Sequence, residues 1–346
     1  MKSFFECNFF KQNFNLENKF IVTQNEISLK DKLQANKFSF EKKQIKYTCE
    51  WIKNKDWVTE KPCILMPIKD SAQILKTTLK NFDENSVYEH VNVIVIDDRS
   101  KENLKEIVKD KCSYLRVDND KGFNFSMLMN IAAGVCNALD IKEVFLWNCD
   151  LWCPDSQAIP KLLSKHRESN SKISGSKLVY PPIEMSLNGE EDTENIKFLD
   201  KKMLNGKWRE TVQFGGDVWI LTPQNNTYIH PVHFKRFADP SNPLVNCDRG
   251  SCFITGALHL WDLKTFIDLG GLNPSLSRNF QDADLCLRCI EAGSIPRYFG
   301  KDLYFYHDES AVFNNLIDET KFNKQMQSDN VLFGKIWNEK IMEIIL

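Results

Sequence analysis

The 346-residue sequence predicts an α/β fold with a doubly wound, mainly parallel sheet flanked by helices. Two observations lead to this prediction. From about residue 62 onward, short apolar segments rich in β-branched residues alternate with segments of helical periodicity. Three of the apolar segments also end abruptly in polar residues, as strands do when their carboxyl ends form a ligand-binding edge.

The composition is that of an ordinary globular protein, and it excludes several classes of function. A formal net charge of -2 gives no signal for binding a polyanion, so nucleic acid is not an expected partner. The apolar segments are all far shorter than a membrane span. The 11 cysteines are odd in number and scattered, which suits a reducing compartment. We therefore expect a cytoplasmic protein, and peripheral association with the inner face of a membrane stays open.

The two ends of the chain lack the alternating pattern. Residues 1–60 are rich in Lys, Asn, Glu and Phe, and we expect an N-terminal extension with some helix and no chemistry of its own. Trp51 and Trp57 indicate that the end of this extension packs on something. Residues 311–346 predict a C-terminal amphipathic helix that covers the main domain, which we place at residues 61–310.

The first half of the main domain follows the order strand, helix, strand, helix. The expected elements are strands at 63–68, 91–96, 114–117 and 144–147 and helices at about 74–82, 103–109 and 122–138. Alternation at this spacing implies a parallel sheet with right-handed crossovers.

Polar groups end three of these strands, at Lys69-Asp70, Asp97-Asp98 and Asn148-Cys149-Asp150. Adjacent carboxylates repel each other, so the doubled Asp97-Asp98 implies a donor group or a cation nearby. A carboxylate at such a strand end is well placed to bind the base or ribose of a nucleotide. The sequence has neither G-x-G-x-x-G nor G-x-x-x-x-G-K, so the dinucleotide and P-loop modes are not supported.

The second half is less regular. Lys172–Val179 predicts an edge strand, and residues 181–250 form an irregular insertion expected on the ligand-facing edge. Phe253–Leu260 predicts a strand in which Gly256 permits close approach of backbone or ligand.

Three acidic or basic positions near the end of the main domain are candidates for chemistry. Asp282 and Asp284 lie near the start of a predicted helix, where the dipole favours anions. An i,i+4 ion pair with Arg288 accounts for Asp284 as a structural residue. Leu303–Tyr306 predicts a strand that ends at His307.

Together these segments resemble the family-2 glycosyltransferases of the GT-A fold, which build bacterial surface polysaccharides and related glycans. The matching segments are Met66–Asp70, Val93–Ser100, Lys121-Gly122 with Asn130, Leu146–Asp150, Ser174–Tyr180, Thr255–Ala257, Gly270-Gly271, Phe280–Arg288 and His307–Ser310. The resemblance implies a Rossmann-like, mixed but mainly parallel sheet over residues 61–310, with the insertion at 181–250 on the acceptor side.

The resemblance also implies roles for the donor. The positions expected to bind the nucleotide sugar are Pro67, Asp97, Asp98, Asn130, Asn148, Gly256 and Ala257. Asn148-Cys149-Asp150 resembles the Asp-x-Asp metal motif in an Asn-x-Asp variant, so Asp150 and His307 are expected to bind Mn²⁺ or Mg²⁺. Asn148 removes one negative charge from that motif.

Asp282 occupies the position of the family's catalytic base, which deprotonates the acceptor hydroxyl for an attack that inverts the anomeric centre. Gln281 replaces the usual preceding glutamate, which puts the acceptor type in doubt. The implied activity is transfer from a nucleotide-diphosphate sugar to a hydroxyl of a glycan or glycoconjugate. The donor sugar, the base, the acceptor and the oligomeric state are not predicted.

Two other functions are considered. A nucleotidyltransferase shares a related fold and metal chemistry, but it is expected to have a Gly-rich basic loop after the first strand, which Pro67–Asp70 is not. A catalytically silent protein that binds a nucleotide or carbohydrate is the alternative from another class. The retained Asp282 favours an enzyme.

Overall fold

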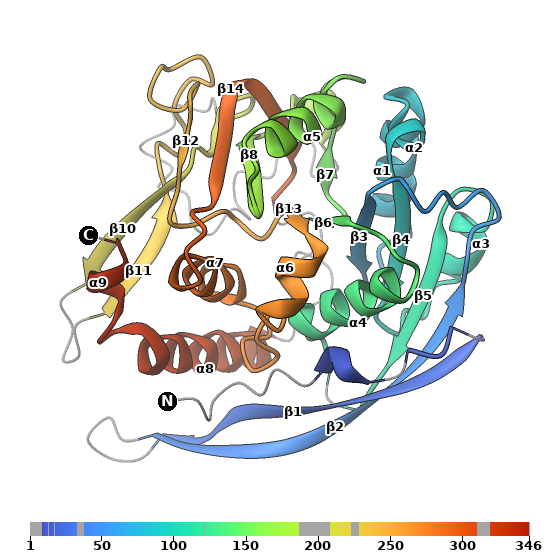
Figure 1. The fold of residues 1–346 in the computed structure, drawn as a ribbon, viewed down its shortest axis with the longest axis horizontal. Helices are drawn as coiled ribbons and strands as arrows, with labels where there is room; N and C mark the ends of the chain where they lie inside the picture. The colour runs from blue at the N-terminus through green and yellow to red at the C-terminus, as the bar shows by residue number, and fades with distance from the viewer. Residues whose placement is uncertain are drawn as a thin grey trace.

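The computed structural model describes residues 9–12, 14–16, 18–32, 38–120, 122–186, 208–222, 228–309 and 319–345. Within these residues a 12-stranded sheet forms the core, and its main path follows the order β1-β2-β5-β4-β3-β6-β13-β8-β14-β12 (Figure 1).

The parallel part of the sheet lies at its centre. β3 (Cys63–Ile68) pairs with β4 (Asn92–Asp97) on one side and with β6 (Glu143–Trp147) on the other, and β4 pairs with β5 (Ser113–Asp118). All six residues of β3 and of β4 are buried, as expected for parallel strands covered on both faces.

The chain reverses its direction of travel across the sheet after β5. β3, β4 and β5 follow one another outward, and α4 (Phe125–Ala138) then carries the chain back past them to β6. Because such crossovers are right-handed, this reversal puts α4 on the face opposite α1 (Ala72–Glu84). The carboxyl ends of β3 and β6 therefore border the switch point where ligands bind in open α/β sheets.

An antiparallel strand makes the sheet mixed. β13 (Leu258–Asp262) runs antiparallel between β6 and β8 (Ile173–Val179). β14 (Arg297–His307) then pairs parallel with β8, and β12 (Asp248–Gly250) pairs antiparallel with β14. The expected mixed, mainly parallel sheet flanked by helices is thus the observed fold.

The remaining elements cover the sheet or extend its edge. They are η1 (Phe9–Lys11), α2 (Val87–His90), α3 (Leu104–Val108), β7 (Leu151–Trp152), α5 (Ala158–Glu168), η3 (Ile183–Met185), β9 (Val212–Phe214), β10 (Asp217–Thr222), β11 (Tyr228–His233), α6 (Leu263–Asp268), α7 (Gln281–Glu291), α8 (Glu319–Trp337) and α9 (Ile341–Ile345). β10 and β11 form a separate two-stranded sheet inside the segment expected to be irregular. None of the helices described is both long and apolar enough to span a membrane.

The N-terminal extension differs from expectation, because it forms strands where some helix was expected. β1 (Lys19–Lys32) and β2 (Phe38–Ile52) make a long antiparallel hairpin along one edge of the molecule, and β2 pairs with β5 (Figure 1). Ile45, Tyr47, Cys49 and Trp51 are the buried side chains of β2, and they alternate with exposed polar ones. This period of two is a strand pattern.

Two further expectations in the second half of the chain were wrong. β8 is not an edge strand, since β13 and β14 flank it on both sides. The segment Phe253–Ala257 is a loop, and the strand begins only at Leu258. The loop leaves the sheet because Gly256 turns its backbone toward Asp282.

We predict that the N-terminal hairpin folds as one unit with the sheet. Replacing Trp51, which is 3% exposed, with alanine should lower the free energy of unfolding by about 3–5 kcal/mol because it leaves a cavity beside β5. Chemical denaturation measures this change. Lys46→Ala, an exposed change on the same strand, is the control and should leave stability nearly unaltered. Equal stability of the two variants would mean that the hairpin contributes little to the cooperative fold.

Candidate active site

The two carboxylates at the end of β4, Asp97 and Asp98, differ in how fully hydrogen bonds from the protein satisfy their oxygens. Both are completely buried. Asp97 Oδ2 accepts hydrogen bonds from Tyr114 Oη at 2.5 Å and Arg116 Nη1 at 2.9 Å, and Oδ1 accepts one from the Ser100 amide at 2.7 Å. Protein groups thus satisfy both Asp97 oxygens, which accounts for this residue as a support for the turn after β4.

Asp98 has partners that are themselves partly exposed. Arg99 donates to both carboxylate oxygens at 2.8 and 3.1 Å, and Lys69 Nζ lies 3.4 Å from Oδ2. The cations expected from the doubled carboxylates are therefore present. Both cationic partners of Asp98 reach solvent. Asp97 has the partly exposed Arg116, but the buried Tyr114 and the Ser100 amide hold it as well. Asp98 is therefore the member of the pair that a ligand can approach by moving its partners.

Pro67 borders the switch point between β3 and β6. The pairing of these strands runs from Cys63 to Leu65, and Pro67 lies beyond its last pair. Proline has no N–H with which to extend a ladder. The two strands therefore part here, on the side where Asn148 follows β6.

Asn148, Asp150 and His307 come together at the carboxyl edge of the sheet. Asp150 Oδ1 lies 3.4 Å from His307 Nε2, and Asn148 Nδ2 lies 3.5 Å from the same ring nitrogen. The backbone holds them there, because β7 pairs with the end of β14 and the Asp308 amide donates to the Asp150 carbonyl at 3.0 Å. Trp147 is fully buried and donates to the Leu151 carbonyl, which closes the turn.

The Asp150–His307 pair fits a divalent cation. Within the described residues, neither Asp150 Oδ1 nor His307 Nδ1 has a hydrogen-bond partner, although both side chains are about 95% buried. Such orphaned polar atoms are costly unless a ligand meets them. Burial alone would lower the pKa of His307, but the nearby Asp150, Glu309 and Asp308 carboxylates raise it overall. A cation bound here would displace that imidazole proton.

The protein supplies too few groups to enclose a metal by itself. The described part of the chain contains no cluster of three or more His, Cys, Asp or Glu side chains arranged for a metal ion. Mg²⁺ and similar ions are often held by one or two carboxylates together with substrate phosphates. Asp150 and His307 fit that arrangement, in which the donor completes the coordination.

Asp282 begins α7 with both carboxylate oxygens engaged by backbone amides. Oδ2 accepts from Gly256 N at 2.7 Å, and Oδ1 accepts from Ala283 N at 2.9 Å. Burial raises the pKa of Asp282 to about 6, although the two hydrogen bonds from backbone amides oppose this rise. The residue is partly exposed. It is thus a carboxylate whose basicity suits proton abstraction near neutral pH.

Gly256 and Ala257 link Asp282 to the segment that carries Asn148 and Asp150. The Ala257 carbonyl accepts from the Asn148 amide at 3.0 Å, one residue after the bond from Gly256 to Asp282. A Cβ at Gly256 would lie 3.1 Å from Asp282 Oδ2, so glycine leaves room for the carboxylate. The backbone of these two residues, which were expected to contact the donor, positions Asp282 and Asn148.

The hydrogen bonds of Asn130 give it a structural role that needs no ligand. It is 1% exposed, its Nδ2 donates to the Leu272 carbonyl at 2.7 Å, and its Oδ1 accepts from the Leu272 amide at 2.9 Å. The side chain therefore ties the Gly270-Gly271 turn to α4.

Asp284 is also structural, as its spacing predicted. Arg288 Nη2 donates to its Oδ2 at 2.7 Å, and Trp337 Nε1 donates to its Oδ1 at 3.0 Å. Asp284 is 2% exposed. It is therefore not available to a substrate as a base.

Two arginines beside His307 were missed at the sequence level. Arg209 Nη1 donates to Asp308 at 3.2 Å, and Arg236 pairs with Glu309. Both arginines come from the insertion, where no periodic pattern draws attention to them. The available signal was the acidic pair Asp308-Glu309, which calls for cations by the argument already applied to Asp97-Asp98.

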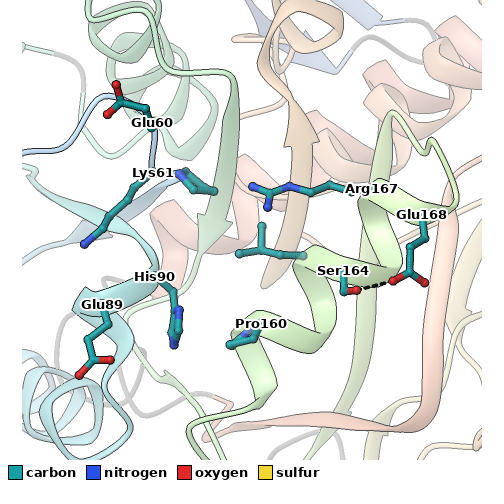
Figure 2. A pocket seen from close by; sticks show the side chains of 10 residues that line it. Glu60, Lys61, Glu89, His90, Pro160, Ser164, Arg167 and Glu168 are labelled. Atoms are coloured by element: carbon teal, nitrogen blue, oxygen red, sulfur yellow. Dashed lines mark hydrogen bonds between the residues drawn. The ribbon is translucent and has the colours of Figure 1, made fainter.

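The pocket of Figure 2 lies away from this site. It opens between α2 and α5, next to Lys61 and His90, which directly precede the starts of β3 and β4. Its charged side chains are of mixed sign, and Arg167 forms hydrogen bonds with both oxygens of Glu143. This is the amino end of the parallel strands, opposite the ligand-binding edge.

Comparison with solved structures gives distant similarities. The structure titled GalNAc-T7 with UDP, GalNAc and Mn²⁺ is 12% identical, with a TM-score of 0.49 over 72% of this chain and 44% of that one. Staphylococcus aureus TarS 1–349 is 11% identical, with a TM-score of 0.46 over 83% and 75% of the two chains. The mannosyltransferase PcManGT from Pyrobaculum calidifontis, with GDP-Man and Mn²⁺, is 10% identical, with a TM-score of 0.44 over 80% and 64%. The chain thus spans less than half of the first of these proteins.

No curated protein matches the sequence. A family model does, over residues 63–221, which are just under half of the chain. The matched segment contains Asp98 and Asn148-Cys149-Asp150, whereas Asp282 and His307 lie beyond it. The model is that of glycosyl transferase family 2, so residues 63–221 are similar to the domain of that family.

Proposed function

We propose that this enzyme is an inverting, divalent-metal-dependent glycosyltransferase that transfers a sugar from a nucleotide-diphosphate donor to a hydroxyl of a glycan or glycoconjugate. One observation carries the proposal. The Gly256 amide donates to Asp282, and the Ala257 carbonyl accepts from the Asn148 amide. Asn148 in turn lies close to Asp150 and His307. A basic carboxylate and a metal-binding pair are therefore neighbours in one rigid frame.

The donor half of the site uses the crevice between β3 and β6. Asp98, with Pro67 beside it, would receive the nucleoside, and Asn148 would lie next to the diphosphate. Asp150 and His307 would hold Mn²⁺ or Mg²⁺, which supplies the positive charge that stabilises a leaving nucleoside diphosphate. The Asp150 Oδ1 atom, which has no hydrogen-bond partner among the described residues, supports this role.

The acceptor half uses Asp282. With a pKa of about 6, its carboxylate is mostly ionised at neutral pH and still basic enough to take a proton from a hydroxyl. The deprotonated oxygen would attack the anomeric carbon on the face opposite the diphosphate, which inverts that centre. Asp284 cannot share this task, since Arg288 and Trp337 occupy its oxygens.

The acceptor would be recognised by the insertion at 181–250 and by Gln281. Gln281 is 8% exposed, and its Oε1 has no hydrogen-bond partner among the described residues. A carboxamide oxygen in that state can accept a hydrogen bond from a substrate. The sequence resemblance supports a glycan of the bacterial surface-polysaccharide kind, made in the cytoplasm with peripheral contact at the inner face of the membrane.

We predict that Asp282→Asn lowers kcat by about 10²–10⁴-fold, the range typical of a lost general base. The wild-type kcat/KM should fall as the pH drops below about 6, because protonation of Asp282 removes the base. The variant should lose this acidic limb and still bind a nucleoside diphosphate. Asp268→Asn, an exposed acid on the C-terminal end of α6, is the control. Unchanged turnover of Asp282→Asn would remove the residue from the reaction.

We also predict that donor binding requires the cation. In a thermal-shift screen, the matching nucleoside diphosphate should stabilise the protein with Mn²⁺ and not with EDTA, by about 2.7 kcal/mol at one hundred times its Kd. Asp150→Asn and His307→Ala should each weaken this shift, and EDTA should abolish turnover. Full activity in EDTA would exclude the metal role. Metal-dependent binding without turnover of any sugar would instead favour a catalytically silent binding protein.

A further inference from the structure

Three residues on α8 form a buried stripe against the start of α7. Asp329, Phe333 and Trp337 follow one another at intervals of four residues, so they lie on one face of the helix. Their exposed fractions are 0%, 0% and 2%. Each contacts a different point around Asp282, and none has a role in the mechanism above.

Asp329, on a separate helix, holds the segment that leads into α7. Its Oδ2 accepts hydrogen bonds from the Arg278 amide at 2.8 Å and the Asn279 amide at 3.0 Å, and Gln325 Nε2 donates to its Oδ1 at 2.8 Å. The N-cap position of α7 is Phe280, whose side chain cannot accept a hydrogen bond. Asp329 therefore fixes the two residues that lead into the helix.

Phe333 holds that N-cap residue in an unusual backbone conformation. Phe280 has a φ of 59°, in the left-handed region that bulky residues rarely adopt. Its ring stacks on Phe333, with centroids 4.6 Å apart and planes 24° from parallel. A conformation of this kind persists only where its surroundings impose it, and this stack is one of the contacts that do so.

Trp337 fixes the other side of the base. Its Nε1 donates to Asp284, two residues after Asp282, and Arg288 ties the same carboxylate to the carbonyls of Leu269 and Gly271. The first turn of α7 is thus held on both sides of Asp282, at residues 278–280 and at Asp284.

We propose that Asp329, Phe333 and Trp337 are positioning residues that hold Asp282 in its reactive geometry. We call these three side chains the α8 brace. The proposal rests on the proposed role of Asp282 as the base. Proximity effects are steep, since displacement of a reacting group by about 1 Å can cost about 100-fold in rate. The contacts of Phe333 and Trp337 given above lie on α7, whereas Asp329 also interacts electrostatically with Arg278, which interacts in turn with Asp98 of the donor half.

Steady-state kinetics of Asp329→Ala and Phe333→Leu in the full chain tests the brace. Both variants should lower kcat by about 100-fold, and Phe333→Leu should leave the metal-dependent binding of the nucleoside diphosphate within about twofold. The acidic limb near pH 6 should also shift, because the environment of Asp282 changes. Asp329→Asn should recover most of the rate, since an amide oxygen can still accept from the Arg278 and Asn279 amides.

Leu163→Ala separates positioning from simple loss of stability. Leu163 is 6% exposed on α5 and lines the distant pocket of Figure 2, so its loss should lower the melting temperature without moving the acidic limb. Rates are compared at equal folded fraction. If Asp329→Ala and Phe333→Leu match Leu163→Ala in kcat and in pH profile, the brace is only structural and the proposal is wrong.

Hydrogen exchange of residues 278–283 distinguishes the brace from the proposed function. Asp329→Ala should raise exchange there, whatever chemistry Asp282 performs. Raised exchange with an unchanged kcat, in a protein that Asp282→Asn inactivates, would overturn the brace and leave the function standing. Full activity of Asp282→Asn would overturn both.

Discussion

The candidate site depends on the backbone of Gly256-Ala257, because this loop is hydrogen-bonded both to Asp282, the proposed base, and to Asn148, which lies beside the proposed metal ligands. Its position follows from strand direction. β13 is antiparallel to β6, and Leu258 at its start pairs with Trp147 at the end of β6. The residues just before β13 must therefore lie over the carboxyl end of the parallel strands. A parallel strand in this place would have delivered its leading loop to the opposite edge.

Charge compensation separates the proposed metal ligand and the proposed base from the other acids of the site. The Asp97, Asp98, Asp308 and Glu309 carboxylates each have an arginine partner, and Asp284 has Arg288. Asp150 has only a histidine at 3.4 Å, and Asp282 has only backbone amides. A carboxylate with little access to water and no permanent cation is costly, so these two acids are the ones prepared for a cation and a proton that arrive with substrates.

The sequence was sufficient for the strand ends, since apolar segments that stop at polar residues have one simple physical meaning. Asp98, Asp150 and His307 were predicted to lie at strand ends, and in the structure they lie at or just after the carboxyl ends of β4, β6 and β14. Prediction from the sequence failed where the composition of an element does not reveal which of its side chains are buried. The β1–β2 hairpin was missed because the prediction followed the Lys-, Asn-, Glu- and Phe-rich composition of residues 1–60, although buried side chains alternate clearly from Ile45 to Trp51. The α8 brace includes a carboxylate on the buried face, which breaks the apolar stripe by which a packed helix is recognised.

Asn148 shows how the two proposed functional groups share one backbone segment. Its backbone amide donates to the Ala257 carbonyl, and the preceding residue, Gly256, donates to Asp282. The Asn148 side chain lies 3.5 Å from His307 Nε2, on the side of the proposed cation. A carboxylate at this position would add affinity for a cation. Without a cation it would add a second negative charge beside Asp150, where like charges repel. The neutral amide side chain would therefore give up some attraction for the proposed metal and avoid that repulsion.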